Sequence, residues 1–311
     1  MKKYFILAAA ALTLAACSNE ESENRVDNNV IRLTANMGET TLTRAGTSIQ
    51  STAFEENELV KIEVTPSSGS MVSKVYKAGA PSGNVNELSV NTGGDAFTWP
   101  ASGTVAIKAF YPSAVGSSTA SFSVSTDQSN TGSATGTTDV EKGYKGSDLM
   151  YATPITSQTK QSDAVALTFN HALTKIVVTL TKGTGMTDDD IAACEVTLNA
   201  KKTAAISGGD FASLTASDDA AVTITAGTGA NTAAIIVPQT IAASTNFITI
   251  TTSGSHSVSY PLPAEKTFAA GSVYTYSFTV GISGITLQST TITGWNSTGD
   301  GKTIDGGTLT I

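Results

Sequence analysis

The chain has little charge and few side chains suited to catalysis. Charged residues make up 14% of its 311 residues, and acidic residues outnumber basic ones by 26 to 18. A negative surface repels phosphate backbones, and the sequence offers no basic stripe to bind them. The composition therefore excludes nucleic acid as a partner.

Cysteine is equally scarce, since the chain contains only Cys17 and Cys194. Cys17 follows an apolar N-terminal run and is predicted below to carry lipid, so Cys194 has no expected partner. Disulfides are therefore not expected to hold the fold together. Cys194 lies in an apolar run, which predicts an inert buried thiol rather than a nucleophile.

Recognisable catalytic motifs are absent. The sequence contains no Gly-x-Ser-x-Gly elbow, no His-Glu-x-x-His, no Cys-x-x-Cys pair and no Gly-rich phosphate loop. We expect the two histidines, His171 and His256, to be packed and hydrogen-bonded, and Trp99 and Trp295 to pack in the core rather than bind sugars. Residues 188–190 are three aspartates that predict the start of a helix rather than a calcium loop. The sequence predicts no enzyme activity and no catalytic, cofactor or metal site.

The first residues have the pattern of a bacterial lipoprotein signal. Lys2 and Lys3 precede an apolar run at 4–16, which ends in Leu-Ala-Ala followed by Cys17. The run is shorter than the ~20 residues that a membrane-spanning helix needs. We predict a signal peptide at 1–16 and lipid attachment at Cys17. The alternative is an ordinary secretory signal that happens to end at a cysteine. The polar, acidic stretch at 18–23 predicts a tether.

After the tether, apolar and polar residues alternate with a period of two, most clearly at 60–64, 105–111 and 274–280. Such alternation predicts strands with one face in a core and one in water. The fold is therefore predicted to be all-β, with an antiparallel sandwich at 45–158 and a second at 159–311. One helical turn is expected at 187–193. The inward-facing residues have odd numbers at 165–173 and even numbers at 176–180. This change predicts a β-bulge near Thr174.

Several segments occur in a recognisable order. They are Phe97-Thr98-Trp99-Pro100 with 105–112, Asp148-Leu149-Met150-Tyr151-Ala152 with 167–176, and the runs at 236–240, 268–276 and 292–295. Together they resemble the fimbrillin (Mfa-like) family of Bacteroidetes. The resemblance covers essentially the whole chain after the signal.

The resemblance implies two tandem transthyretin-like β-sandwiches in a subunit of a type V fimbria. It also implies a lipoprotein precursor on the extracellular face of the outer membrane, held there by the lipid on Cys17. The acidic stretch after Cys17 resembles the signal for that destination. In this family a trypsin-like or arginine-specific protease cuts after an arginine, the first strand leaves, and a strand of another subunit fills the groove. The matching positions here are Arg44 and Ala45.

Both ends of the chain suit this mechanism. The apolar residues of 31–37, namely Ile31, Leu33, Ala35 and Met37, alternate with polar ones and predict the removable strand of the segment 17–44. At the other end, Leu309 and Ile311 have strand spacing and form a candidate donor strand, although two preceding glycines weaken it. The alternative for Arg44 is an ordinary solvated loop residue.

The sequence thus predicts a structural or adhesive subunit of a surface fimbria. The expected partners are other fimbrial subunits, the outer membrane, the processing protease, and a host or bacterial surface ligand. Stalk, tip and anchor roles stay open. The alternative function is a monomeric surface lipoprotein that binds glycan or host protein, in which case Cys17 remains a lasting anchor.

Overall fold

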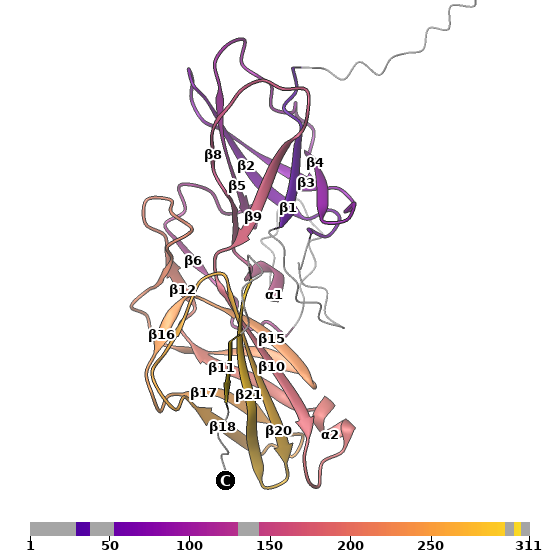
Figure 1. Ribbon diagram of the computed structural model, residues 1–311, viewed down its shortest axis with the longest axis vertical. Helices are drawn as coiled ribbons and strands as arrows, with labels where there is room; N and C mark the ends of the chain where they lie inside the picture. The colour runs from indigo at the N-terminus through magenta and orange to yellow at the C-terminus, as the bar shows by residue number, and fades with distance from the viewer. Residues whose placement is uncertain (1–28, 38–52, 130–142, 296–301, 306–311) are drawn as a thin grey trace, which may run out of the picture.

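The computed structural model describes residues 29–37, 53–129, 143–295 and 302–305, and their regular structure is almost entirely β-strand (Figure 1). The predicted all-β class is confirmed. Within these residues, no helix is long and apolar enough to cross a membrane.

The elements of the first half of the chain are β1 (Leu33–Met37), β2 (Leu59–Pro66), β3 (Val72–Ala78), β4 (Val85–Val90), β5 (Val105–Tyr111), β6 (Ser121–Ser123), α1 (Gly143–Gly146), β7 (Met150–Ala152), β8 (Ile155–Gln158) and β9 (Val165–His171). Those of the second half are β10 (Thr174–Lys182), α2 (Asp188–Ala192), β11 (Glu195–Ala200), β12 (Thr203–Ala205), β13 (Thr215–Ala216), β14 (Val222–Thr228), β15 (Asn231–Ile236), β16 (Gln239–Ile241), β17 (Asn246–Thr251), β18 (Ser257–Pro261), β19 (Lys266–Phe268), β20 (Ser272–Gly281), β21 (Gly284–Gly294) and β22 (Lys302–Asp305).

The first sheet closes on itself. Its strands follow the order β2-β3-β4-β1-β9-β7-β5-β8, and a further pairing of β5 with β2 completes a ring from which β8 extends. The strands alternate inward apolar and outward polar side chains, so the ring encloses its own core. One pairing in the ring, between β1 and β9, is parallel, and this differs from the antiparallel sheet that the sequence predicted.

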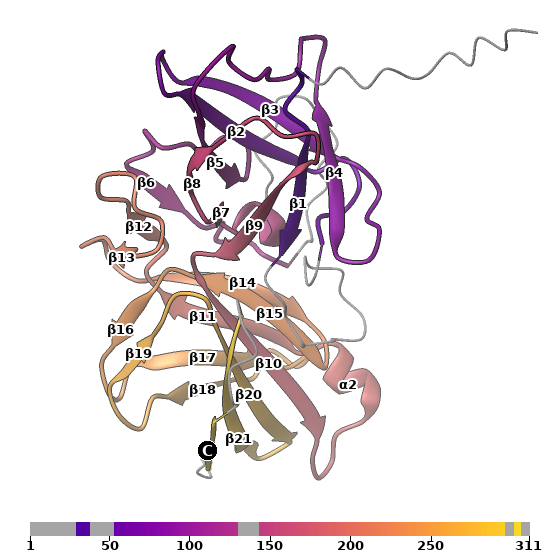
Figure 2. The ribbon, with the colours of Figure 1, turned by 45° about the horizontal axis from the view of Figure 1, so that its top comes forward.

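The second half is a sandwich at the other end of the molecule (Figures 1 and 2). One layer has the order β15-β10-β20-β21-β22 and the other β14-β11-β17-β18. The antiparallel expectation again fails at one place, because β10 and β20 run parallel along their length. Two small sheets, β13-β12-β6 and β16-β19, complete the fold.

The two hydrophobic cores divide the chain near the end of β9. The ring core includes Val165, Leu167 and Phe169, whereas Ala172 and Leu173 belong to the core of the sandwich. The division is not strictly sequential, because β6 pairs with β12 of the second half. The boundary between 158 and 159 stays a prediction about separate folding units.

The parity change that predicted a bulge has another cause. The backbone pairing of β10 with β15 and β20 runs without interruption from Thr174, so no bulge lies there. The chain instead leaves the ring after His171 and enters the sandwich at Thr174. In β9 the odd-numbered residues face the core of the ring, and in β10 the even-numbered residues face the core of the sandwich.

The single helix predicted from the second half is confirmed as α2. The hydroxyl of Thr187 accepts a hydrogen bond from the backbone N–H of Asp190, and the Asp190 carboxylate accepts one from the backbone N–H of Thr187. This reciprocal capping box satisfies two amide groups that the helix itself leaves unpaired.

Candidate functional site

The strand predicted at 31–37 is an integral part of the ring. β1 lies between β4, with which it pairs antiparallel, and β9, with which it pairs parallel. Its apolar residues Ile31, Leu33, Ala35 and Met37 are all buried, while Arg32 is exposed. The amphipathic strand expected from the alternation is therefore present, and its removability stays a prediction.

Backbone hydrogen bonds extend this attachment to the residues before β1. The N–H of Ile31 donates to the carbonyl of Phe97 at 2.7 Å, and the N–H of Trp99 donates to the carbonyl of Asn29 at 2.7 Å. On the other side, the N–H of Val165 donates to the carbonyl of Arg32 at 2.8 Å. If residues 29–37 left, β4 and β9 would each lose one of their two paired strands, and the closed ring would open.

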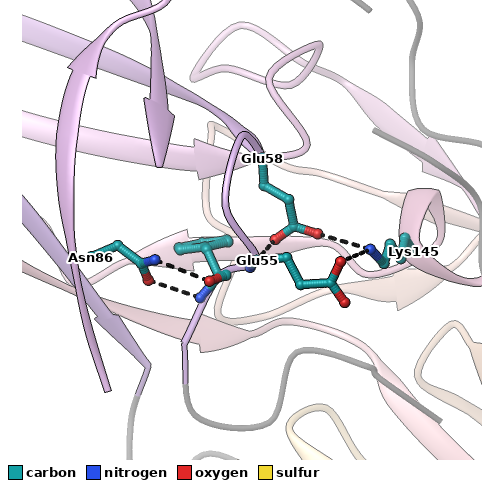
Figure 3. Close-up of polar contacts among 5 residues, drawn as sticks. Glu55, Glu58, Asn86 and Lys145 are labelled. Atoms are coloured by element: carbon teal, nitrogen blue, oxygen red, sulfur yellow. Dashed lines mark hydrogen bonds and ion pairs between the residues drawn. The ribbon is translucent and has the colours of Figure 1, made fainter. Parts of the chain in front are cut away.

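After β1, the next described residues begin at 53, and Phe54 is held by hydrogen bonds to the ring. The side chain of Asn86 on β4 accepts a hydrogen bond from the N–H of Phe54 at 2.9 Å and donates to the carbonyl of Phe54 at 3.0 Å (Figure 3). The same amide also donates to the carbonyl of Gly79 at 2.8 Å. The Phe54 ring is buried in the ring core, edge-on to Phe169 with centroids 4.9 Å apart.

A buried ion-pair cluster lies beside this attachment. The ammonium of Lys145 on α1 is 2.5 Å from a carboxylate oxygen of Glu55 and 3.5 Å from one of Glu58 (Figure 3). The side chains of Lys145 and Glu58 are 7% and 1% exposed, whereas that of Glu55 is 43% exposed. Glu58 also accepts a hydrogen bond from the N–H of Glu55 at 3.0 Å. The cluster joins the segment after β1 to α1, whose Tyr144 packs in the core of the sandwich.

Sequence reasoning missed this polar cluster. Asn86 and Lys145 each lie in sequence that looks like ordinary solvated surface. The one available signal was that Asn86 shares its parity with the buried Leu88 on β4. An inward asparagine needs several hydrogen-bonding partners, and finding them requires the tertiary structure.

Several predicted site residues lie outside the described part of the chain. They are Cys17, Arg44, Ala45, Leu309 and Ile311. The structure therefore tests neither lipidation nor cleavage. Just before the predicted donor strand, β22 pairs with β21 at the edge of one sandwich layer.

His171 and Trp295 join the ring to the sandwich. The His171 imidazole lies 2.8 Å from a carboxylate oxygen of Asp148 and stacks on the Trp295 indole, with ring centroids 3.8 Å apart. Both aromatic side chains are buried, as is Trp99, so these three predictions of core packing are confirmed. The prediction for His256 was wrong, because that side chain is exposed in the turn between β17 and β18.

The expected burial of Cys194 is confirmed. Cys194 is fully buried, and burial together with the nearby Asp190 carboxylate raises the pKa of its thiol. A raised pKa favours the protonated thiol, which is a weaker nucleophile than the thiolate. Across the described part of the chain, no three His, Cys, Asp or Glu side chains are grouped so that they could hold a metal ion.

A profile of proteins described as fimbrillin-like matches residues 43–295, which is most of the chain. The chain belongs to the fimbrillin-like family. The profile match begins beside Arg44, so β1 lies ahead of the matched residues.

This fimbrillin-like chain is 30% identical over 160 residues to a Bacteroides uniformis protein provisionally named fimbrium subunit Fim1C. The match covers 48% of this chain and 52% of Fim1C, so the chain spans about half the length of the curated relative it matches.

Two solved structures of provisionally named cell adhesion proteins are similar in fold. One, from Bacteroides uniformis, has a TM-score of 0.63 at 20% identity and covers 90% of this chain and 98% of its own. The other, from Bacteroides ovatus, has a TM-score of 0.58 at 14% identity, with 91% and 98% covered. At these identities the likeness establishes the fold alone.

Proposed function

We propose that this fimbrillin-like chain is a structural or adhesive subunit of a cell-surface fimbria. It is exported as a lipoprotein precursor with lipid on Cys17, cut after Arg44, and polymerised by strand exchange with other subunits. The observation that carries the proposal is the position of β1 between β4 and β9. This strand lies on the N-terminal side of Arg44, and the rest of the ring lies on the C-terminal side.

The distribution of arginine supports cleavage at this position. The chain contains three arginines, Arg25, Arg32 and Arg44, and none follows Arg44. Arg32 lies within the paired residues beside β1, and its side chain contacts the carbonyl of Ser162. A strand held in a sheet is a poor protease substrate, because cleavage requires an extended and accessible segment. An arginine-specific protease that cuts after Arg44 would leave a subunit without further arginines to cut.

Cleavage after Arg44 makes β1 easier to replace, which strand exchange requires. Three large apolar side chains, Ile31, Leu33 and Met37, are buried. Burial at ~1.5–3 kcal/mol each holds the strand in place before ordering costs. In the uncut chain a covalent connection also keeps β1 at an effective concentration in the millimolar range. A cut after Arg44 removes that connection, so a strand of another subunit can then compete for the same ring position.

The proposal also includes location, partners and architecture. The precursor is held by its lipid on the extracellular face of the outer membrane, and the mature subunit resides in the fimbria, where it contacts a host or bacterial surface ligand. Leu309 and Ile311 belong to the strand offered to the next subunit. We further propose that the units at 45–158 and 159–311 are relatives of transthyretin-like sandwiches.

The test is an Arg44→Ala variant, with Arg25→Ala as the matched control. Each variant is expressed on the cell surface, fibres are examined by electron microscopy, and the surface protein is sequenced from its N-terminus. We expect Arg25→Ala to give fibres whose subunits begin at Ala45. We expect Arg44→Ala to remain a lipidated precursor without fibres.

Normal fibres from the Arg44→Ala variant would show that cleavage at this position is not required. A wild-type protein that starts at lipidated Cys17 and remains monomeric would instead support the surface-lipoprotein alternative.

A further inference from the structure

Among the inward-facing residues of β1, Ala35 has neighbours that differ from those of the others. In the ring, Ala35 lies directly opposite Asn86 on β4 and directly beside Leu167 on β9. All three residues are buried, so their side chains share the inner face of the sheet. Opposed residues in an antiparallel ladder have Cβ atoms only ~5 Å apart. The Ala35 side chain is therefore flanked closely on both sides.

We propose that Asn86 makes the Ala35 position a size filter, so that the groove occupied by β1 accepts a strand only if its residue at this position is small. The inference rests on the proposed strand exchange and specifies its partner. The fitting partner is an extended segment of another subunit that carries Gly, Ala or Ser at this position.

Asn86 is suited to this role because it is fixed in place. Its side-chain carbonyl accepts from the N–H of Phe54, and its amide nitrogen donates to the carbonyls of Phe54 and Gly79, at 2.8–3.0 Å. Its exposed fraction is 0%. A rotation that made room for a larger neighbour would leave the backbone groups of Phe54 unpaired in the core, which is unfavourable.

None of these bonds involves β1. The Phe54 backbone and the Gly79 carbonyl both belong to the chain that remains after a cut at Arg44. Phe54 is held in addition by its ring, which packs 4.9 Å from Phe169 and 5.4 Å from Tyr111 between centroids. The filter is thus built into the acceptor and persists when β1 leaves.

The neighbouring inward residues of β1 are paired with apolar residues. Leu33 lies between Leu88 and Val165, and Met37 lies beside Phe169. Large apolar side chains fill these positions. The four inward residues of a fitting strand are therefore large at the positions of Ile31, Leu33 and Met37 and small at the position of Ala35. The pairing also sets direction, since the strand must run parallel to β9 and antiparallel to β4.

The experiment uses protein cut after Arg44 and fluorescent peptides of residues 29–44, whose entry into the ring is followed by anisotropy. The parent peptide is compared with an Ala35→Leu peptide. The matched control is Thr34→Leu, which places the same leucine side chain one residue away on the outer face of β1. Because overpacking a close-packed site is unfavourable, we expect Ala35→Leu to bind ~10- to 100-fold more weakly than the parent. Thr34→Leu should bind within ~3-fold of it, because its side chain meets no such flank.

Equal binding of the two leucine peptides would overturn the filter and leave strand exchange intact. Failure of the parent peptide to enter would overturn both proposals. An Asn86→Ala acceptor, checked for folding by circular dichroism, tests the assignment to Asn86. We expect the difference between the two leucine peptides to shrink in this acceptor, and an unchanged difference would show that another group sets the size limit.

Discussion

Replacing Lys145 with methionine tests whether the buried cluster after β1 stabilises the fold. Methionine has a similar length but no charge, so the change removes the ammonium group that lies 3.5 Å from the Glu58 carboxylate, which is 1% exposed. Removing one partner of a buried ion pair typically destabilises a protein by 3–5 kcal/mol. Because Glu55 is 43% exposed and Glu58 keeps the Glu55 N–H as a donor, we expect the lower end, about 3 kcal/mol.

The assay is urea denaturation, and the chain provides its own control. Lys182 pairs with Asp188 at 2.9 Å, but these side chains are 53% and 85% exposed. Lys182→Met should therefore change the free energy of unfolding by no more than ~0.5 kcal/mol. Adding Glu58→Gln to Lys145→Met removes the buried negative charge and keeps an acceptor, so it should restore about 1–2 kcal/mol. If Lys145→Met costs no more than Lys182→Met, the cluster does not stabilise the fold and the reasoning is refuted.

Three further predictions concern the sandwich. With Cys17 replaced by serine, the thiol of Cys194 should not react with a disulfide reagent until the protein unfolds, because burial raises its pKa; rapid reaction of native protein would contradict this. Burial also raises the pKa of Tyr276 above its ordinary value of 10.0, so the free energy of unfolding should fall as pH rises past about 10, where the unfolded tyrosine ionises. Tyr276→Phe should flatten that decline in denaturation curves recorded between pH 8 and 11, and an unchanged slope would argue against it. Thr187→Ala should lower stability by about 1 kcal/mol through loss of the helix cap, and a thermal melt would detect it.

Local sequence patterns predicted the strands well. The alternation at 60–64, 105–111 and 274–280 corresponds to β2, β5 and β20, and the period-two residues of 31–37 are buried in β1. A period of two identifies a strand and its inner face without knowledge of its neighbours. The same local signal gave a wrong prediction at Thr174. The chain passes from one sheet to another there and has no β-bulge.

The candidate site was only partly predictable. The apolar residues of β1 were found because they alternate with polar ones, and their partners were not found. Asn86 and Phe54 are 32 residues apart, and Lys145 and Glu55 are 90 residues apart. Their sequence surroundings give no sign that these polar groups meet in the interior. Side-chain hydrogen bonds and ion pairs depend on where the backbone places each group.

The sequence by itself determined which residues form strands, which face of each strand is buried, and that the chain belongs among all-β proteins with few chemically reactive side chains. Only the tertiary structure decided that β1 lies between β4 and β9, that it runs parallel to β9, and that Asn86 flanks Ala35. The physical reason is that backbone N–H and C=O groups are alike in nearly every residue, so strand pairing follows from the packing of the whole core.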